Sequence, residues 1–237
     1  MLTEAEWLAC SDSAPMLTFL RQDIVLLVDE LPTSSRREAL RTFLLEAATR
    51  KLRLFSCWCA RRVWNELLDD RSQKAVEVVE HFVDGLATEE ERWAARLAAI
   101  EARNAIRGHL IRRVAANAAY AVSGFEIEEA ASESANVVVW VDGPMELSVA
   151  RAEQAQILHC IFGNPFQPAT LDPAWRTSTV VALARGIYEE RAFDRMPILA
   201  DALQDAGCGS DDVLNHCRDA GPHARGCWVV DLVLGKQ

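Results

Sequence analysis

The stretch TEEERWAARLAAIEARNAIRGHLIRRVAANAAYA, residues 88–121, decides the fold class of this chain. It is rich in alanine and arginine, two residue types with strong intrinsic helix propensity. Thr88 and Glu91 have the spacing of a capping box, in which a hydroxyl and a carboxylate satisfy backbone N–H groups at a helix start. These features predict one long helix over 89–121 with a basic exposed face.

Helical signals continue on both sides of this stretch. Thr3 with Glu6 and Ser35 with Glu38 repeat the capping-box spacing. Apolar residues recur every three or four positions, the period of an amphipathic helix, over 17–31, 40–47, 75–86, 180–188 and 198–206. We therefore predict a mainly α protein, a bundle-like arrangement of antiparallel helices joined by short loops, with little or no sheet.

Two segments leave a strand possible, because both are rich in β-branched residues. VVVWV, residues 137–141, has no apparent partner strand, which favours a helix end or an irregular segment. WVVDLVL, residues 228–234, lies between Pro222, suited to a first helical position, and Gly235, suited to the position just past a helix end. A helix from Pro222 to Gly235 is the preferred interpretation of this second segment.

Charge and polarity divide the chain into parts. An acidic, polar segment at 126–144 is predicted to link an N-terminal helical region, 1–125, to a C-terminal helical module, 145–237. Residues 1–125 contain 17 basic and 18 acidic side chains, whereas residues 126–237 contain 8 and 17. An acidic C-terminal half repels nucleic-acid phosphates and anionic lipid, so we expect neither as a partner. A basic or neutral protein partner is easier to accommodate.

The sequence also bears on location. Glu4 and Glu6 stand where a signal peptide needs basic residues, and no apolar run approaches the roughly 18 residues of a membrane span. The prediction is a cytoplasmic protein. In that reducing compartment its seven cysteines are expected as free thiols or metal ligands rather than disulfides.

Several short segments of the sequence carry a family resemblance: TEAEWLAC at 3–10, KLRLFSCWCARRVW at 51–64, IFGNPFQP at 161–168, LDPAW at 171–175, YEERAFDRMPILADALQDAGC at 188–208 and GPHARGCWVVDLVLGK at 221–236. Together they resemble a family of uncharacterised planctomycete bacterial proteins. The resemblance implies relatives but no activity, so it assigns no catalytic residue. This chain has Cys57-Trp58-Cys59-Ala60 where the family has Cys-Ala-Cys-Cys, and residues 23–49 resemble an insertion. These differences argue against a complete metal site at the first cysteine cluster.

The second cysteine cluster is GCGSDDVLNHCRDAGPHARGC, residues 207–227. Its cysteines and one of its histidines are suitable ligands for tetrahedral zinc, in the spacing C-x8-C-x5-H-x3-C, namely Cys208, Cys217, His223 and Cys227. A helix over 210–217 would separate the two ends of that segment by roughly 10 Å and so competes with a four-ligand site. A buried cluster of core thiols is the alternative to a metal site.

Without Cys208, three ligands remain. His223 and Cys227 would share one face of a helix that starts at Pro222. A fourth ligand could then come from elsewhere in the chain, and the candidates are His216, Cys57, Cys59 and His159.

Catalytic signatures are missing from the sequence. It has no G-x-G-x-x-G, no P-loop, no H-E-x-x-H and no G-x-S-x-G. The leading expectation is therefore a noncatalytic helical interaction or adaptor protein, with an unidentified protein partner and no cofactor. The first alternative is a zinc-binding protein, structural or catalytic. The second is a thiol-dependent enzyme in which Cys227 is the nucleophile and His223 its base.

Acidic residues of the C-terminal half have structural interpretations. Asp231 lies within an apolar run, so we predict that it is buried and paired with Arg225 or another arginine. Arg191 and Arg195 lie among five carboxylates, which favours surface ion pairs over an acid/base site; these are Glu189, Glu190, Asp194, Asp201 and Asp205.

Overall fold

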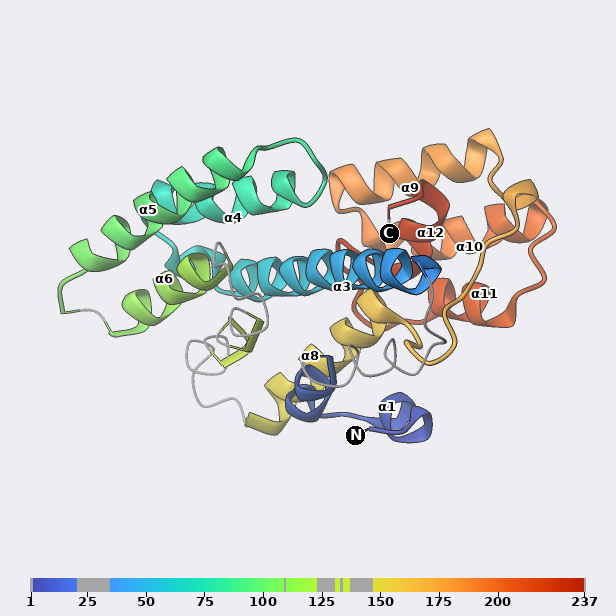
Figure 1. Ribbon diagram of the computed structural model, residues 1–237, viewed down its shortest axis with the longest axis horizontal. Helices are drawn as coiled ribbons and strands as arrows, with labels where there is room; N and C mark the ends of the chain where they lie inside the picture. The colour runs from blue at the N-terminus through green and yellow to red at the C-terminus, as the bar shows by residue number, and fades with distance from the viewer. Residues whose placement is uncertain are drawn as a thin grey trace. The chain divides into compact units, whose positions relative to one another are not determined.

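The computed structural model describes residues 2–20, 35–108, 110–122, 131–132, 134–136 and 147–236. Helices supply the regular secondary structure of these residues, and no strand occurs among them (Figure 1). The predicted mainly α fold is confirmed. The segment 137–141 lies outside the described residues. No helix of the described ranges has the length and apolarity needed to cross a bilayer.

The chain divides into two compact units, Met1–Ala155 and Gln156–Gln237. The boundary falls within helix α8, Leu147–Phe162. Most of the predicted linker at 126–144 lies outside the described residues, so the division into 1–125, 126–144 and 145–237 stays a prediction.

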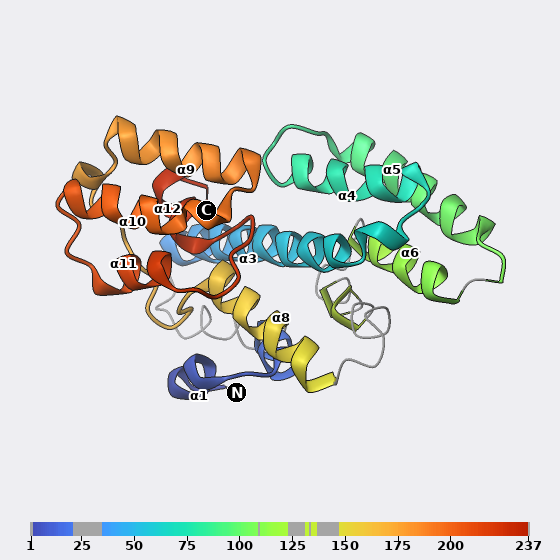
Figure 2. The ribbon, with the colours of Figure 1, turned by 180° about the vertical axis from the view of Figure 1, so that it is seen from behind.

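The N-terminal unit is a set of helices in which α4 packs along α5, both contact α6, and α6 contacts α3 (Figures 1 and 2). The capping boxes predicted at Thr3 and Thr88 are both present, because each hydroxyl accepts from the backbone and each N3 glutamate reaches back. Its elements are α1 (Glu4–Ala9), a helical segment at 13–20, α3 (Ser35–Arg62), η1 (Trp64–Glu66), α4 (Asp70–Phe82), α5 (Glu89–Ala105) and α6 (Leu110–Val122).

The single long helix predicted over 89–121 is wrong, because the chain breaks between α5 and α6. Gly108 takes a positive φ of 73°, which glycine adopts without the steric cost of a side chain. The break lets α5 and α6 pack against each other. Arg96 and Arg103 on α5 place their guanidinium groups 4.2 and 4.4 Å from the ring centre of Tyr120 on α6. Packing across this hairpin outweighs the local propensity to continue one helix.

A partly buried ion pair joins α3 to α4 in the same unit. The guanidinium of Arg61 donates to both carboxylate oxygens of Glu80, with N···O distances of 2.7 and 2.6 Å. Glu80 is buried, and Arg61 also lies over the ring of Trp64. A bidentate pair of this kind fixes how the two helices are aligned along their lengths.

The C-terminal unit packs α9 against α10 and α12, with α11 contacting both α10 and α12 (Figures 1 and 2). Thr177 and Ser210 cap α9 and α11 with their hydroxyl groups. Besides the end of α8, its elements are η2 (Pro173–Trp175), α9 (Ser178–Glu190), η3 (Phe193–Arg195), α10 (Met196–Asp205), α11 (Asp211–Arg218) and α12 (Trp228–Leu234). Its core includes four cysteines: Cys160, Cys208, Cys217 and Cys227.

Helix α12 begins later than predicted. It starts at Trp228 rather than Pro222, because Gly226 has a φ of 89° and Cys227 is extended at the N-cap. Gly235 ends the helix in the left-handed conformation, as expected. The segment 228–234 is therefore a helix and not a strand. Asp231 within it is only 1% exposed, which confirms its predicted burial, and its pairing with an arginine stays a prediction.

Candidate metal centre

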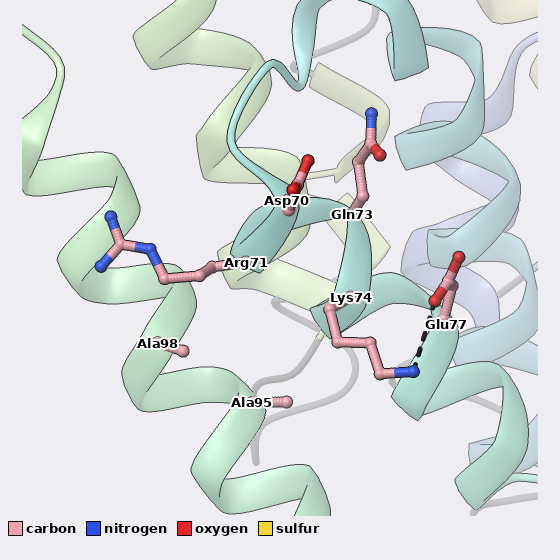
Figure 3. A pocket seen from close by; sticks show the side chains of 7 residues that line it. All are labelled: Asp70, Arg71, Gln73, Lys74, Glu77, Ala95 and Ala98. Atoms are coloured by element: carbon pink, nitrogen blue, oxygen red, sulfur yellow. Dashed lines mark hydrogen bonds and ion pairs between the residues drawn. The ribbon is translucent and has the colours of Figure 1, made fainter.

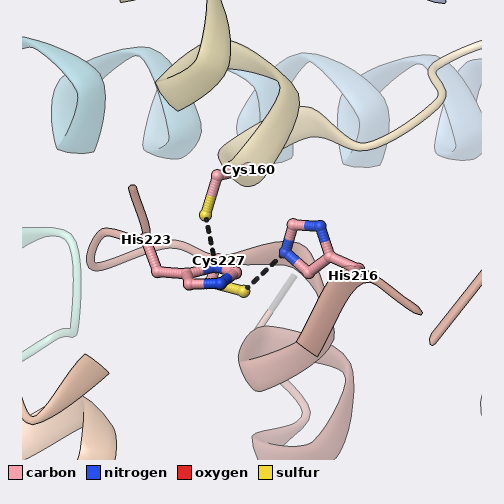
Figure 4. A group of neighbouring side chains, drawn as sticks. All are labelled: Cys160, His216, His223 and Cys227. Atoms are coloured by element: carbon pink, nitrogen blue, oxygen red, sulfur yellow. Dashed lines mark hydrogen bonds between the residues drawn. The ribbon is translucent and has the colours of Figure 1, made fainter. Parts of the chain in front are cut away.

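Four side chains of the C-terminal unit converge on one point (Figure 4). Cys160 comes from the last turn of α8, and His216 comes from the last turn of α11. His223 lies in the loop after α11, and Cys227 is the N-cap residue of α12. Each offers one ligand atom, and the four atoms all lie within 4.8 Å of one another. Three separate elements and one loop thus meet at this group, which we call the Cys2His2 cluster.

Two close contacts define the geometry of the Cys2His2 cluster. Cys160 Sγ lies 3.5 Å from His223 Nδ1, and His216 Nε2 lies 3.2 Å from Cys227 Sγ. In a tetrahedral zinc site, metal–ligand distances of about 2.0–2.3 Å place neighbouring ligand atoms roughly 3.3–3.8 Å apart. The 3.5 Å contact already has that spacing, and the 3.2 Å contact is about 0.1 Å shorter. The widest separation needs a contraction of about 1 Å to fit the same tetrahedron.

The two histidine rings are held in place by their surroundings. His223 Nε2 lies 3.4 Å from the backbone carbonyl oxygen of Asp219, which can accept a hydrogen bond from it. This bond leaves the lone pair of Nδ1 directed at the cluster, as is usual for a metal-binding histidine. The ring of His216 meets that of His223 edge-on at 5.0 Å and packs at 5.1 Å against Trp228.

The electrostatics of the cluster separate its two thiols. Burial disfavours a thiolate at Cys227, but hydrogen bonds from Cys160, His216 and His223 and the charge of His216 hold its pKa well below the usual cysteine value. Burial and the neighbouring Cys227 raise the pKa of Cys160. Burial lowers the pKa of His223, yet its interactions with Cys227 outweigh this and leave that pKa raised. Without a metal the cluster therefore favours a thiolate at Cys227 and a thiol at Cys160, and a divalent cation bound by both sulfurs would displace the Cys160 proton.

Only part of the predicted ligand set belongs to this cluster. His223 and Cys227 are members, although a loop and not a helical face brings them together. Cys217 and Cys208 are buried in the hydrophobic core of the same unit and are not members. Burial raises the pKa of Cys217. A zinc site that uses Cys208 and Cys217 stays a prediction that the cluster does not require.

Of the other candidates for a fourth ligand, His216 is in the cluster. His159 is not a member, and Cys57 and Cys59 are buried on α3 in the N-terminal unit. Cys160 was not among the predicted ligands, because it lies 56 positions before His216 and outside the second cysteine cluster. Its position as a cysteine at the apolar end of a helix was the one available signal.

The thiol-enzyme alternative finds its two residues in the cluster. Cys227 is 0% exposed, so a substrate could reach its sulfur only after the surrounding chain moves. Of the surface carboxylates predicted to form ion pairs, Glu190 pairs with the predicted Arg195 at 3.0 Å, and Asp201 pairs instead with Arg218 at 3.2 Å. Neither observation indicates an acid/base site.

A depression of about 460 Å³ lies between α4 and α5 in the N-terminal unit (Figure 3). Among its charged side chains, Arg71 pairs with Asp69 and Lys74 with Glu77. The part contributed by α5 is formed by Ala95 and Ala98. An open surface of paired charges and alanine has little capacity to select a ligand.

Comparison of the chain with models of protein families, with curated proteins and with solved structures found no match.

Proposed function

We propose that the C-terminal unit is a zinc-binding helical module and that the ion has a structural role. One observation carries this proposal: the ligand atoms of Cys160, His216, His223 and Cys227 lie within 4.8 Å of one another. Cys160 lies 56 residues before His216 and yet joins three residues that lie close together in sequence, and side chains of these types are expected to be hydrogen-bonded or bound where they meet.

The donor set identifies the class of ion. Two sulfur and two imidazole nitrogen atoms suit zinc, whereas calcium and magnesium require oxygen ligands. Four protein ligands fill a tetrahedral coordination shell and leave no position for a substrate or an activated water. This closed shell favours a structural role over a catalytic one.

The position of the cluster explains what the ion would stabilise. Cys160 and His216 lie in the last turns of α8 and α11, and Cys227 is the N-cap residue of α12. The loop between α11 and α12, with no regular secondary structure over most of its length, supplies His223. A bound ion would therefore cross-link the ends of three helices and fix the loop, in a unit small enough for metal binding to contribute substantially to its stability.

Metal analysis of the full chain, purified without chelator, tests the proposal. We expect about one zinc per chain, and a cobalt-substituted sample should show thiolate-to-cobalt charge transfer in its absorption spectrum. The Cys160→Ser and His216→Ala variants should each lose most of the zinc. A wild-type content below about a tenth of an equivalent, in protein never exposed to chelator, would contradict the assignment.

We also propose that the C-terminal unit binds a basic or neutral protein partner, which is the adaptor function expected from the sequence. The observation that favours it is Ile198 on α10, which is 53% exposed beside the exposed Asp201 and Asp205. The acidic side chains around it would complement a basic partner surface. A pull-down from source lysate with wild type and with Ile198→Ser tests this: the variant should lose the partner, and recovery of self-association alone would contradict it.

A further inference from the structure

The two sulfur atoms of the Cys2His2 cluster come from distant positions but lie within 4.8 Å of each other. A disulfide bond requires a sulfur–sulfur distance of about 2.05 Å, so a relative movement of less than about 3 Å would join them. We propose that the cluster is also a redox switch, in which peroxide converts Cys160 and Cys227 to a disulfide and thereby releases the ion. This regulation rests on the proposed zinc site.

The chemistry needs only the two sulfurs and the oxidant. The thiolate of Cys227 attacks one oxygen of hydrogen peroxide, breaks the O–O bond and becomes a sulfenic acid, and the other oxygen leaves as hydroxide. The thiolate of Cys160 then attacks the Cys227 sulfur, forms the S–S bond and expels a second hydroxide. Two protons convert both hydroxides to water. Two thiolates are thus oxidised, one peroxide is reduced, and the ion loses half of its ligands.

Geometry favours this pair over the other thiols of the unit. Each sulfur of the pair has an imidazole nitrogen beside it, at 3.2 Å for Cys227 and 3.5 Å for Cys160. Coordination to the proposed zinc ion would keep both sulfurs as thiolates, the reactive form, and water can supply the two protons. The other two cysteines, Cys208 and Cys217, are surrounded by the apolar core.

Access to the cluster is through its histidines. His216 and His223 are partly exposed, whereas Cys160 and Cys227 are buried. A reagent therefore reaches the two sulfurs only after a local opening at these rings, and hydrogen peroxide needs a smaller opening than a bulky thiol reagent does. Oxidation by peroxide should therefore be much faster than alkylation of the same two cysteines in the folded chain.

The experiment uses the full zinc-loaded chain and hydrogen peroxide. Zinc content is measured before the oxidant is added, and release is then followed with a chromogenic zinc indicator. At each time point the remaining thiols are blocked, and disulfides are mapped by mass spectrometry of unreduced peptides. We expect zinc release and the Cys160–Cys227 cross-link to increase together in a one-to-one ratio, and a thiol reductant to restore zinc binding.

The matched control is Cys208→Ser, which removes a buried thiol of the same unit and should leave the rate and the ratio unchanged. Zinc release without the Cys160–Cys227 cross-link would overturn the inference, as would a cross-link between Cys208 and Cys217. Full retention of zinc would also overturn it, when oxidised methionines show that peroxide has acted on the chain. A sample that contains no zinc before oxidation instead refutes the proposed function. Disulfide mapping of that same sample still decides whether the two cysteines are coupled.

Discussion

Replacement of His223 by alanine is the sharpest perturbation of the proposed zinc site. The side chain contributes one of four ligand atoms and is only partly buried, so its loss affects the metal more than the packing. Structural zinc sites bind with about 10–16 kcal/mol, so one ligand of four represents roughly 2.5–4 kcal/mol. The expected affinity loss is therefore roughly 10²- to 10³-fold.

The loss of zinc affinity can be measured as a smaller increase in the free energy of unfolding when zinc is added. At free zinc buffered to one hundred times the wild-type Kd, binding should stabilise the wild-type chain by about 2.7 kcal/mol. The His223→Ala variant should gain less than about 0.6 kcal/mol at the same free zinc. For a domain of this size, the wild-type gain corresponds to an increase in Tm of roughly 10–20 °C for the transition that zinc affects.

Calorimetry with and without buffered zinc measures this difference. Each variant is compared with its own zinc-free form, so any packing loss caused by the substitution cancels. His159→Ala is the matched control, because it removes a histidine of the same unit that is not in the Cys2His2 cluster, and it should respond to zinc as wild type does. An equal gain in wild type and His223→Ala would refute the assignment of His223 as a ligand.

Three further predictions concern the N-terminal unit. Glu80→Gln should lower the free energy of unfolding in urea by about 2–4 kcal/mol, because it leaves Arg61 without its bidentate partner. Glu77→Gln, on the exposed face of α4, should lower it by less than about 0.5 kcal/mol. Equal losses in the two variants would contradict the importance of burial. Tyr120→Leu should cost about 1–2 kcal/mol, because both guanidinium contacts across the α5–α6 hairpin are lost, and a neutral effect would show that the hairpin does not depend on them. Finally, the hydrogen bond from Arg92 holds the pKa of Glu89 below its unfolded value of 4.5, so the resulting stabilisation is present above that value and is lost as the pH falls through the folded pKa. Between about pH 7 and about pH 3, Glu89→Gln should therefore lose less stability than wild type, and parallel losses in urea midpoints would contradict the pairing.

Local signals in the sequence predicted the parts of the fold that local chemistry determines. The capping boxes at Thr3 and Thr88 were predictable because donor and acceptor lie three residues apart. The break at Gly108 was not, since alanine and arginine on both sides favour continuation, and only packing of α5 on α6 offsets that preference. The start of α12 was misplaced because Pro222 suits a helix start, while Gly226 and the packing of its neighbours move that start to Trp228.

The candidate site depends even more on tertiary packing, which local sequence signals do not show. His223 and Cys227 were predicted as neighbours from their spacing, and the loop that contains them does bring them together. Cys217 was favoured for its proximity in sequence, but it lies one position after His216 on α11, and successive residues on a helix point in different directions. His216 faces the cluster, and Cys217 faces the core. Cys160 reaches the cluster only through the tertiary packing of α8, which no spacing encodes.

The distance of Cys160 from the other ligands along the chain also affects how fast the C-terminal unit can fold. His216, His223 and Cys227 lie within 12 consecutive residues, so a short, rapid loop closure brings them together. Adding Cys160 closes a segment of 56 residues, at an entropic cost of roughly 3.6 kcal/mol plus a constant. With zinc present, the three nearby ligands would bind the ion first, and the arrival of α8 would complete the shell. The contact of highest sequence separation would then be the slow step, and a partly coordinated ion would be the intermediate that precedes it.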